Sequence, residues 1–218
     1  MPSWDILICS IVHRSGMLKE LLEELDRQLH SHEPGGGGYR TDVKVICWRD
    51  NLQTPYGLKI GGMQDYSRAD YVCCVDDDDW IAHDYITRIT AALAEGPDYV
   101  GFPVGYTVDG HPSLPVRHSL KYGCWETRQD MIVRDISEKN PMRRKLATAA
   151  HWEGTYGAEE RWARRIRELG QVISEIYIPD PMYFYRFRSD DHFNIARAPL
   201  TGWPPVPDYP WLTMLGDS

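Results

Sequence analysis

The segment best suited to chemistry is a run of four aspartates, Asp76 to Asp79, that follows the apolar residues 71–75. Carboxylates two positions apart in an extended segment can converge on one cation, and Mg²⁺ and Mn²⁺ prefer such oxygen ligands. The alternative interpretation is a solvated acidic turn that caps the following helix. Four adjacent like charges repel one another unless a cation offsets them. The run therefore predicts a metal site, provided that the fold brings it to a ligand-binding edge.

Two further segments carry side chains suited to catalysis. Glu159 and Glu160 open a predicted helix, where a carboxylate can act as general base toward a hydroxyl group. The simpler interpretation is that acidic residues at a helix N-terminus only stabilise the helix macrodipole. Later in the chain, Arg186 and Arg188 alternate with aromatic residues and precede His192. These arginines can offset the charge of a phosphorylated ligand, or they can simply cover the aromatic rings.

The elements that must position these residues alternate between strand and helix in the first half of the chain. Nearly continuous apolar runs predict buried parallel strands at residues 5–12, 43–48, 71–75 and 99–104. Helices are expected between them, and the clearest one has leucines at helical spacing: Leu18, Leu21, Leu22, Leu25 and Leu29. The alternation predicts an α/β fold with a mostly parallel, Rossmann-like sheet flanked by helices.

Sheets of this type bind ligands beyond the carboxyl ends of their strands. The first predicted strand ends at His13 and Arg14, the second at Asp50, and the third at the aspartate run. These groups should therefore converge on one edge of the sheet. Their convergence favours the metal site over the solvated turn.

The second half of the chain is less regular. Residues 105–140 show no clear period, whereas residues 158–169 predict a helix and residues 172–178 a strand. We expect one domain at residues 1–198, followed by a Pro- and Trp-rich tail at residues 199–218.

Composition restricts the class of protein. The net charge is −8, and residues 1–110 hold 9 Lys and Arg against 18 Asp and Glu, so tight nonspecific binding to nucleic acid is disfavoured. Neither a membrane-spanning run nor a signal peptide is evident. Four of the five cysteines lie in apolar runs, and no Cys-x-x-Cys pair supports zinc or a disulfide framework. The sequence predicts a cytoplasmic protein.

Residues 71–80, an apolar strand followed by the aspartates and Trp80, resemble the aspartate motif of inverting GT-A glycosyltransferases of family 2. The resemblance extends as a pattern of elements over residues 5–105 and again over residues 140–192. It implies a single-domain GT-A fold and a nucleotide-diphosphate sugar as donor, with a UDP-sugar favoured. It also implies a divalent ion, Mn²⁺ or Mg²⁺, as cofactor.

Further matches place donor-binding residues in the first half, residues 1–105. The loop that contains His13 and Arg14 corresponds to a nucleotide-contacting loop, although the family's usual small or hydroxyl residue is missing there. Asp50 occupies the place of an aspartate that reads the nucleobase. Lys59 corresponds to a basic residue near the diphosphate or the aspartates.

Within the aspartate run, the resemblance implies that Asp76 contacts the ribose and approaches the metal, while Asp78 holds the metal. A run of four leaves the register open, so Asp77 and Asp79 are the alternatives, and Asp77 joins the donor-binding residues. His192 stands where the family often has a histidine, and it would complete the metal site or meet the diphosphate.

The second half, residues 106–198, would bind the acceptor and supply the base. The family places its base in a Glu-Asp pair at the start of a late helix. Aligning the Trp-Ala pair that follows makes Glu159 the base, whereas aligning the acidic pair makes Glu160 the base, and we prefer Glu159. Arg186 and Arg188 would offset charge on the leaving diphosphate.

The acceptor is expected near residues 140–144 and Trp152. Candidates are a glycan, a lipid-linked sugar, a protein, or a hydroxymethylated DNA base, since the chain also resembles small glycosyltransferases of bacteriophages. Two other functions compete. A sugar-phosphate nucleotidyltransferase has a similar sheet but a glycine-rich loop after its first strand, where this chain has one glycine. A degenerate module that binds metal and nucleotide without transfer is favoured by Ala158, which replaces the family's glutamate.

Overall fold

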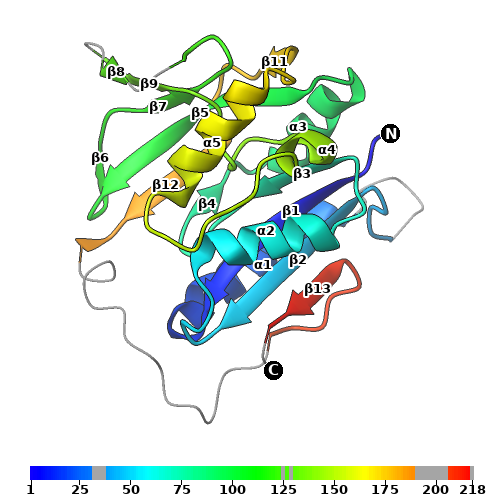
Figure 1. The fold of residues 1–218 in the computed structure, drawn as a ribbon. Coiled ribbons are helices and arrows are strands. Elements are labelled where there is room, and N and C mark those ends of the chain that lie inside the picture. The colour runs from blue at the N-terminus through cyan, green and yellow to red at the C-terminus, as the bar shows by residue number, and fades with distance from the viewer. Residues whose placement is uncertain (31–37, 124–125, 128–129, 190–205, 217–218) are drawn as a thin grey trace.

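The structure is a computed structural model that describes residues 1–30, 38–123, 126–127, 130–189 and 206–216. Parallel strands form the centre of its sheet: β1 (Trp4–Ile11), β2 (Val43–Asp50) and β3 (Tyr71–Cys74). The α-helices described around them are α1 (Ser15–Leu29), α2 (Tyr56–Tyr66), α3 (Tyr85–Ala94), α4 (Arg144–Ala147) and α5 (Ala158–Leu169). The predicted alternation of strands and helices in the first half is confirmed (Figure 1).

The irregular second half extends this sheet. The short antiparallel β10 (Met142–Arg143) lies between β3 and the long strand β5 (Tyr99–Val108). Beyond β10, short strands pair with β5 or with one another: β4 (Trp80–Ile81), β6 (His111–Pro112), β7 (Val116–His118), β8 (Glu126–Thr127), β9 (Ile132–Arg134), β11 (Glu175–Tyr177) and β12 (Tyr183–Phe187). The strand predicted at residues 172–178 is therefore shorter than expected. Past the end of β5 at Val108, the described strands of the unpatterned segment 105–140 have only two or three residues each, too few to give a clear period.

Two apolar clusters hold the helices against opposite faces of the sheet, because successive side chains of a strand point to opposite faces. Ile6 and Ile8 of β1 belong to the cluster that includes the buried residues of α1 and α3. Leu7 and Cys9 belong to the other cluster, with the buried residues of α2, α4 and α5. Burial on both faces explains why β1 is an almost uninterrupted apolar run.

Helix α2 carries glycines where bulky side chains approach it. A Cβ atom at Gly62 would lie 2.7 Å from the Trp48 ring, and one at Gly61 would lie 3.4 Å from Trp152. These glycines lower the intrinsic helix propensity, but the close packing of two tryptophans compensates for them. The helix therefore runs through the pair and ends at Tyr66.

The segment predicted as a separate tail contributes to the sheet. Within it, β13 (Leu212–Leu215) pairs in parallel with β2 at the sheet edge. Trp211 is buried, and its Nε1 donates a hydrogen bond of 3.0 Å to Asp26 Oδ1 on α1. The end of the described chain is therefore joined to β2 through β13 and to α1 through Trp211.

The structure also bears on the predictions about the cysteines and about membrane-spanning segments. The cysteines at positions 9, 47, 73 and 74 are buried and free, as expected for small apolar residues, and Cys124 lies outside the described residues. Among the helices that the structure describes, none combines the length and apolar character needed to cross a bilayer.

Candidate functional site

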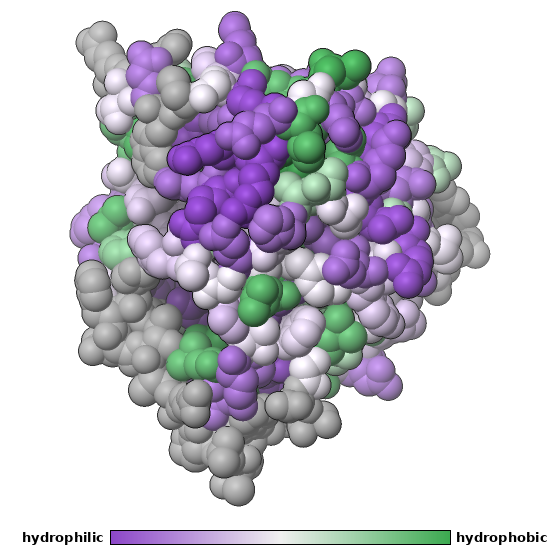
Figure 2. Space-filling view, viewed as in Figure 1, coloured by the Kyte–Doolittle hydropathy of each residue, from purple (hydrophilic) through white to green (hydrophobic). Residues whose placement is uncertain are grey.

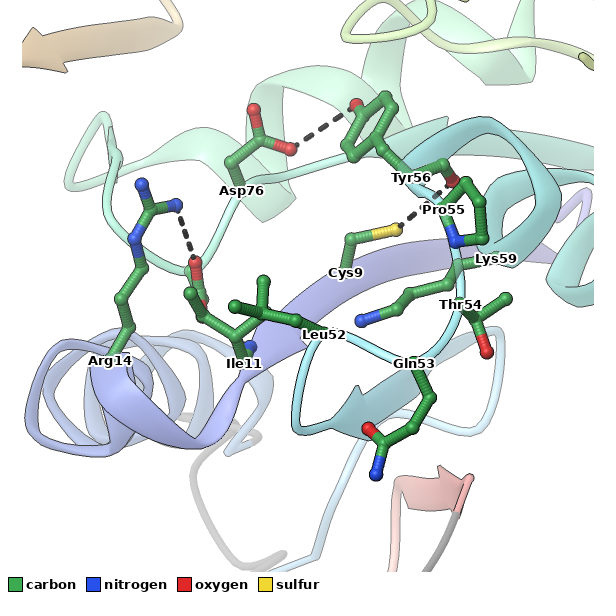
Figure 3. A pocket seen from close by; sticks show the side chains of 11 residues that line it. Cys9, Ile11, Arg14, Leu52, Gln53, Thr54, Pro55, Tyr56, Lys59 and Asp76 are labelled. Carbon is green, nitrogen blue, oxygen red and sulfur yellow. Dashed lines mark hydrogen bonds and ion pairs between the residues drawn. The ribbon is translucent and has the colours of Figure 1, made fainter. Parts of the chain in front are cut away.

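The carboxyl ends of the central strands surround a pocket of about 330 Å³. Arg14, Lys59, Asp76 and Asp77 line it together with the loop after β2, residues 52–56, as Figure 3 shows. Arg14 and Lys59 lie on either side of Ile11 in this view. The edge of the sheet predicted to bind a ligand is therefore hollow and carries both acidic and basic side chains.

The aspartate run is a tight turn rather than an extended segment. The backbone N–H of Asp79 donates a hydrogen bond of 3.2 Å to the carbonyl of Asp76, which folds the run back on itself. As a result, carboxylate oxygens of Asp76, Asp78 and Asp79 lie within 4.8 Å of one another. Three clustered carboxylate oxygens suit a hard divalent cation, so the residues present fit the ion that the resemblance implies.

Asp77 points away from this group. Its carboxylate accepts a hydrogen bond of 3.2 Å from the backbone N–H of Ile11, and it lies 3.4 Å from Arg14 Nη1. Burial raises the pKa of Asp77 to about 7, although Arg14 opposes the shift. Arg14 also reaches Asp78 Oδ2 at 2.9 Å. Asp77 therefore ties the aspartate turn to the end of β1, and Arg14 connects it to the cluster.

Asp79 is held from the opposite side by β12. The Tyr183 hydroxyl donates to one oxygen of Asp79, and the Arg186 backbone N–H donates to the other at 2.8 Å. The Arg186 guanidinium donates to the backbone carbonyls of Asp78 and Asp79, at 3.0 Å each. Burial, reinforced by Asp76 and Asp78, raises the pKa of Asp79 to about 8. Arg186 thus holds the backbone of the aspartate turn.

Asp76 has a partner that the sequence pattern did not reveal. Lys139 Nζ lies 2.5 Å from Asp76 Oδ2 and donates a hydrogen bond of 3.0 Å to the Tyr56 hydroxyl. The Tyr56 hydroxyl in turn donates to Asp76 Oδ1 at 3.3 Å. Lys139 also lies 3.6 Å from Glu138 Oε1. Burial lowers the pKa of Lys139, but Asp76 and Glu138 outweigh it and the net shift is upward.

Asp50 lies behind the pocket lining and organises it. Its carboxylate pairs with Lys59 Nζ at 2.7 Å, and it accepts hydrogen bonds from the backbone N–H groups of Leu52 at 3.0 Å and Thr54 at 2.9 Å. Lys59 Nζ also donates to the Ser10 carbonyl at 2.9 Å. Leu52 has a φ of 64°, in the left-handed region that a residue with a Cβ rarely adopts. Asp50 therefore stabilises a strained loop at the pocket mouth.

The acidic pair at the start of α5 lies at the surface. Gly157, with a φ of 72°, precedes the helix, and both Glu159 and Glu160 are exposed. Glu160 pairs with Arg134 Nη2 at 3.3 Å. Burial raises the pKa of Glu138, and the negative charge of the nearby Glu159 raises it further. Glu159 therefore interacts electrostatically with Glu138, which precedes Lys139 in sequence, whereas Glu160 pairs with Arg134.

Several predicted residues lie elsewhere. His13 is exposed in a short 3₁₀ helix, η1 (Val12–Arg14), and does not line the pocket. Arg188 Nη1 lies 3.6 Å from Met17 Sδ on α1. His192 falls outside the described residues.

The predicted acceptor contacts need correction. Trp152 is buried, stacks on Trp162 at 5.0 Å, and donates from Nε1 to Gln64. Arg143 and Arg144 are bound at the far end of β10, Arg143 to Asp98 and Arg144 to the Ala69 carbonyl. Trp152, Arg143 and Arg144 thus support the fold. The two arginines lie far from the aspartates because β10 runs antiparallel to β3.

No protein-family model matches the chain, and no curated protein matches it by sequence. Solved structures do match. Residues 1–349 of S. aureus TarS in complex with UDP-GlcNAc are 15% identical, with a TM-score of 0.58, and the match covers 90% of this chain and 62% of that one. A longer TarS structure is 14% identical, with a TM-score of 0.59, over 88% of this chain and 38% of that one.

A third structure widens the comparison. The mannosyltransferase PcManGT from Pyrobaculum calidifontis, in complex with GDP-Man and Mn²⁺, is 13% identical, with a TM-score of 0.51. That match covers 93% of this chain and 59% of the mannosyltransferase. The fold is that of the GT-A glycosyltransferases. This chain therefore spans less than two thirds of each of these three relatives and shares their architecture rather than their sequence.

Proposed function

We propose that the protein is a metal-dependent inverting glycosyltransferase that uses a nucleotide-diphosphate sugar. The observation that carries the proposal is the cluster of three carboxylates beside a pocket at the carboxyl edge of a GT-A sheet. Two of the similar structures are complexes with UDP-GlcNAc and with GDP-Man, which supports a donor of this class. A UDP-sugar is the first donor to test.

In this proposal the pocket holds the donor. The nucleobase lies against the loop of residues 52–56, which Asp50 supports from behind. Asp76 contacts the ribose, and Arg14 and Lys59 lie near the diphosphate. Asp78 is the principal metal ligand, with Asp76 and Asp79 beside it. When bound, a divalent ion supplies electrostatic stabilisation of the charge that develops on the diphosphate.

Glu159 is proposed as the general base. An acceptor hydroxyl attacks the anomeric carbon while its proton passes to the Glu159 carboxylate. A new bond forms from the acceptor oxygen to the sugar, and the bond from the sugar to the diphosphate breaks, which inverts the anomeric centre. The exposed position of Glu159 suits a base that receives its substrate from solution, and Glu160 remains the alternative.

The acceptor would approach over the second half of the chain. Hydrophilic side chains gather over α5 in Figure 2, where the helix carries Arg161, Arg164, Arg165 and Arg167. Part of this charge is balanced, since Glu153 pairs with Arg161 and Arg165, and Asp135 with Arg167. An acceptor with negative charge is compatible with this surface. Glycans, lipid-linked sugars, proteins and modified DNA bases all remain acceptors to screen.

The decisive experiment combines ligand-dependent melting with a product assay. The melting temperature is measured with a panel of nucleoside diphosphates and nucleotide sugars, in Mn²⁺ and in EDTA. A ligand at a hundred times its Kd adds about 2.7 kcal/mol, which raises the melting temperature by roughly 5–10 °C. We expect a Mn²⁺-dependent shift with one nucleotide, lost in Asp78→Ala and kept in the control Asp65→Ala, an exposed aspartate at the end of α2. No shift with any nucleotide would refute the proposed donor site.

One observation favours a second function, a module that binds nucleotide and metal without transfer. Ala158, where the family has a glutamate, is buried within the apolar cluster beneath α5. The two functions differ in their product. Release of the free nucleoside diphosphate from a bound nucleotide sugar, with a glycosylated acceptor detected by mass spectrometry, would establish the transferase. Tight binding without product across the acceptor panel would favour the module.

A further inference from the structure

Lys139 occupies an unusual position for a positive charge, because it lies against one of the carboxylates of the proposed metal site. Its side chain is only 12% exposed, and its ammonium lies 2.5 Å from Asp76 Oδ2. The rings of Tyr56 and Tyr183 enclose it, with centroids 5.4 and 5.7 Å from Nζ. The ammonium is therefore confined within the site rather than free at the surface.

The backbone beside Lys139 is fixed on several sides. The Glu138 carbonyl accepts a hydrogen bond of 2.7 Å from the Cys74 N–H at the end of β3. The Asn140 side chain donates to the Val100 carbonyl at 3.0 Å, and the Ser137 N–H donates to the Tyr99 hydroxyl at 3.1 Å. The turn that presents Lys139 is thus anchored to β3 and β5. The lysine side chain can therefore change position without breaking these hydrogen bonds.

The cluster of Asp76, Asp78 and Asp79 therefore has an internal cation at one end. One oxygen of Asp76 is taken by Lys139 and the other by the Tyr56 hydroxyl. A divalent ion that binds Asp76 must share this carboxylate with an ammonium roughly 5 Å from the ion, counting the 2.5 Å contact and a metal–oxygen bond of about 2.1 Å. Repulsion between the two cations weakens binding of the ion. A bound diphosphate supplies negative charge with which the Lys139 ammonium can pair instead of Asp76.

We propose that Lys139 competes with the divalent ion for Asp76, so that the metal binds weakly alone and tightly only together with the nucleoside diphosphate. This inference rests on the proposed donor site and adds a coupling between its two ligands. By thermodynamic linkage, the diphosphate would strengthen metal binding by the same factor as the metal strengthens diphosphate binding. The coupling would prevent the site from retaining a metal ion between donors.

The test measures the affinity for Mn²⁺ alone, by the electron paramagnetic resonance signal of free Mn²⁺, and again with the nucleoside diphosphate selected by melting. Variant Lys139→Gln removes the charge, and Lys139→Met is the second variant should the first fold poorly. A unit charge roughly 5 Å from a divalent ion changes its affinity about ten-fold even at the dielectric constant of water. We therefore expect Lys139→Gln to bind Mn²⁺ alone at least about ten-fold more tightly than wild type, and to show a smaller gain from the nucleotide.

Two controls separate charge from structure. Lys139→Arg keeps the positive charge and should retain weak binding of Mn²⁺ alone. Lys145→Met removes an exposed lysine on α4 and should behave as wild type. A general loss of structure would weaken both ligands, whereas the proposal requires Mn²⁺ alone to bind more tightly.

The outcomes distinguish the two proposals. A wild-type protein that binds Mn²⁺ and nucleotide, together with a Lys139→Gln variant whose affinity for Mn²⁺ alone is unchanged or lower, would overturn the inference about Lys139 only. A wild-type protein that binds neither ligand would overturn the proposed function and, with it, this inference.

Discussion

The two sides of the proposed reaction are built in different ways. On the donor side, Asp50, Asp77 and Asp79 are almost fully buried, and each has a partner within the chain. On the acceptor side, Glu159 and Glu160 are exposed at the start of α5. The donor side is held rigid by paired charges, while the acceptor side presents its acids to solvent. Stability and activity should therefore respond differently to substitutions in the two regions.

The largest expected effect separates activity from stability on the acceptor side. Replacing the proposed base, Glu159→Gln, should lower kcat about 10²- to 10⁴-fold while the melting temperature changes by less than about 2 °C. The matched control Glu160→Gln removes only the pair with Arg134 and should keep kcat within a few-fold of wild type. Steady-state kinetics and melting check both variants.

The opposite result would revise the assignment in a defined way. A large loss of kcat in Glu160→Gln with normal Glu159→Gln would transfer the role of base to Glu160. Full turnover by both variants would show that neither glutamate acts as the base.

Substitutions on the donor side should show the opposite pattern, with a large effect on stability. Lys59→Met leaves the buried carboxylate of Asp50 without its ammonium partner, and loss of one partner of a buried pair costs roughly 3–5 kcal/mol. The melting temperature should fall by roughly 6–20 °C, and nucleotide binding should weaken as the loop of residues 52–56 loosens. The control Lys44→Met, an exposed position on β2, should melt as wild type does. Equal melting temperatures for the two variants would contradict a structural role for the Asp50–Lys59 pair.

The smallest predicted effect concerns a buried histidine on β7, in the second half of the chain. His118 Nδ1 lies 2.9 Å from the Asp135 carbonyl, and burial lowers the pKa of this imidazole to about 4. Because the folded-state pKa lies below the ordinary value of 6.5, protonation favours unfolding. The associated stability is complete above about pH 6.5 and is lost as the pH falls toward 4, up to about 3 kcal/mol.

The variant His118→Asn isolates this effect, since its amide can still donate to the Asp135 carbonyl but does not titrate. Urea unfolding at several pH values should show wild type losing stability relative to the variant between about pH 6.5 and 4. Parallel curves for the two proteins across this interval would contradict the assignment of a buried neutral imidazole.

The same contrast explains what could be predicted from the sequence. The strands that lead to Asp50 and Asp76 are apolar runs that are mostly buried on both faces, so their positions and their common edge follow from hydrophobicity. The direction in which each aspartate side chain points does not follow from hydrophobicity, because a tight turn separates Asp77 from its neighbours and brings Asp79 into the cluster. An extended segment, in which successive side chains point to opposite sides, would not have done so.

Lys139 was missed for a related reason. It lies at the end of the segment 105–140, which has no hydrophobic period, and just before β10, a strand of two residues. No pattern therefore indicates that the chain returns there to the aspartates. Tyr183 and Arg186 come from β12, which pairs with β5 through contacts distant in sequence. Partners that come from short or distant elements become visible only once the topology is known.

The edge strand β13 has a consequence for how the chain folds. It pairs with β2, which belongs to the first quarter of the sequence, and it supplies the last described residues. During synthesis β2 therefore remains an unpaired edge on that side until residues 212–215 have left the ribosome. Unpaired edges of apolar strands are sites of aggregation, and pairing between distant segments is slow. The nascent protein is thus vulnerable to misassembly along β2, even though the residues that line the pocket, between positions 9 and 77, have by then been synthesised.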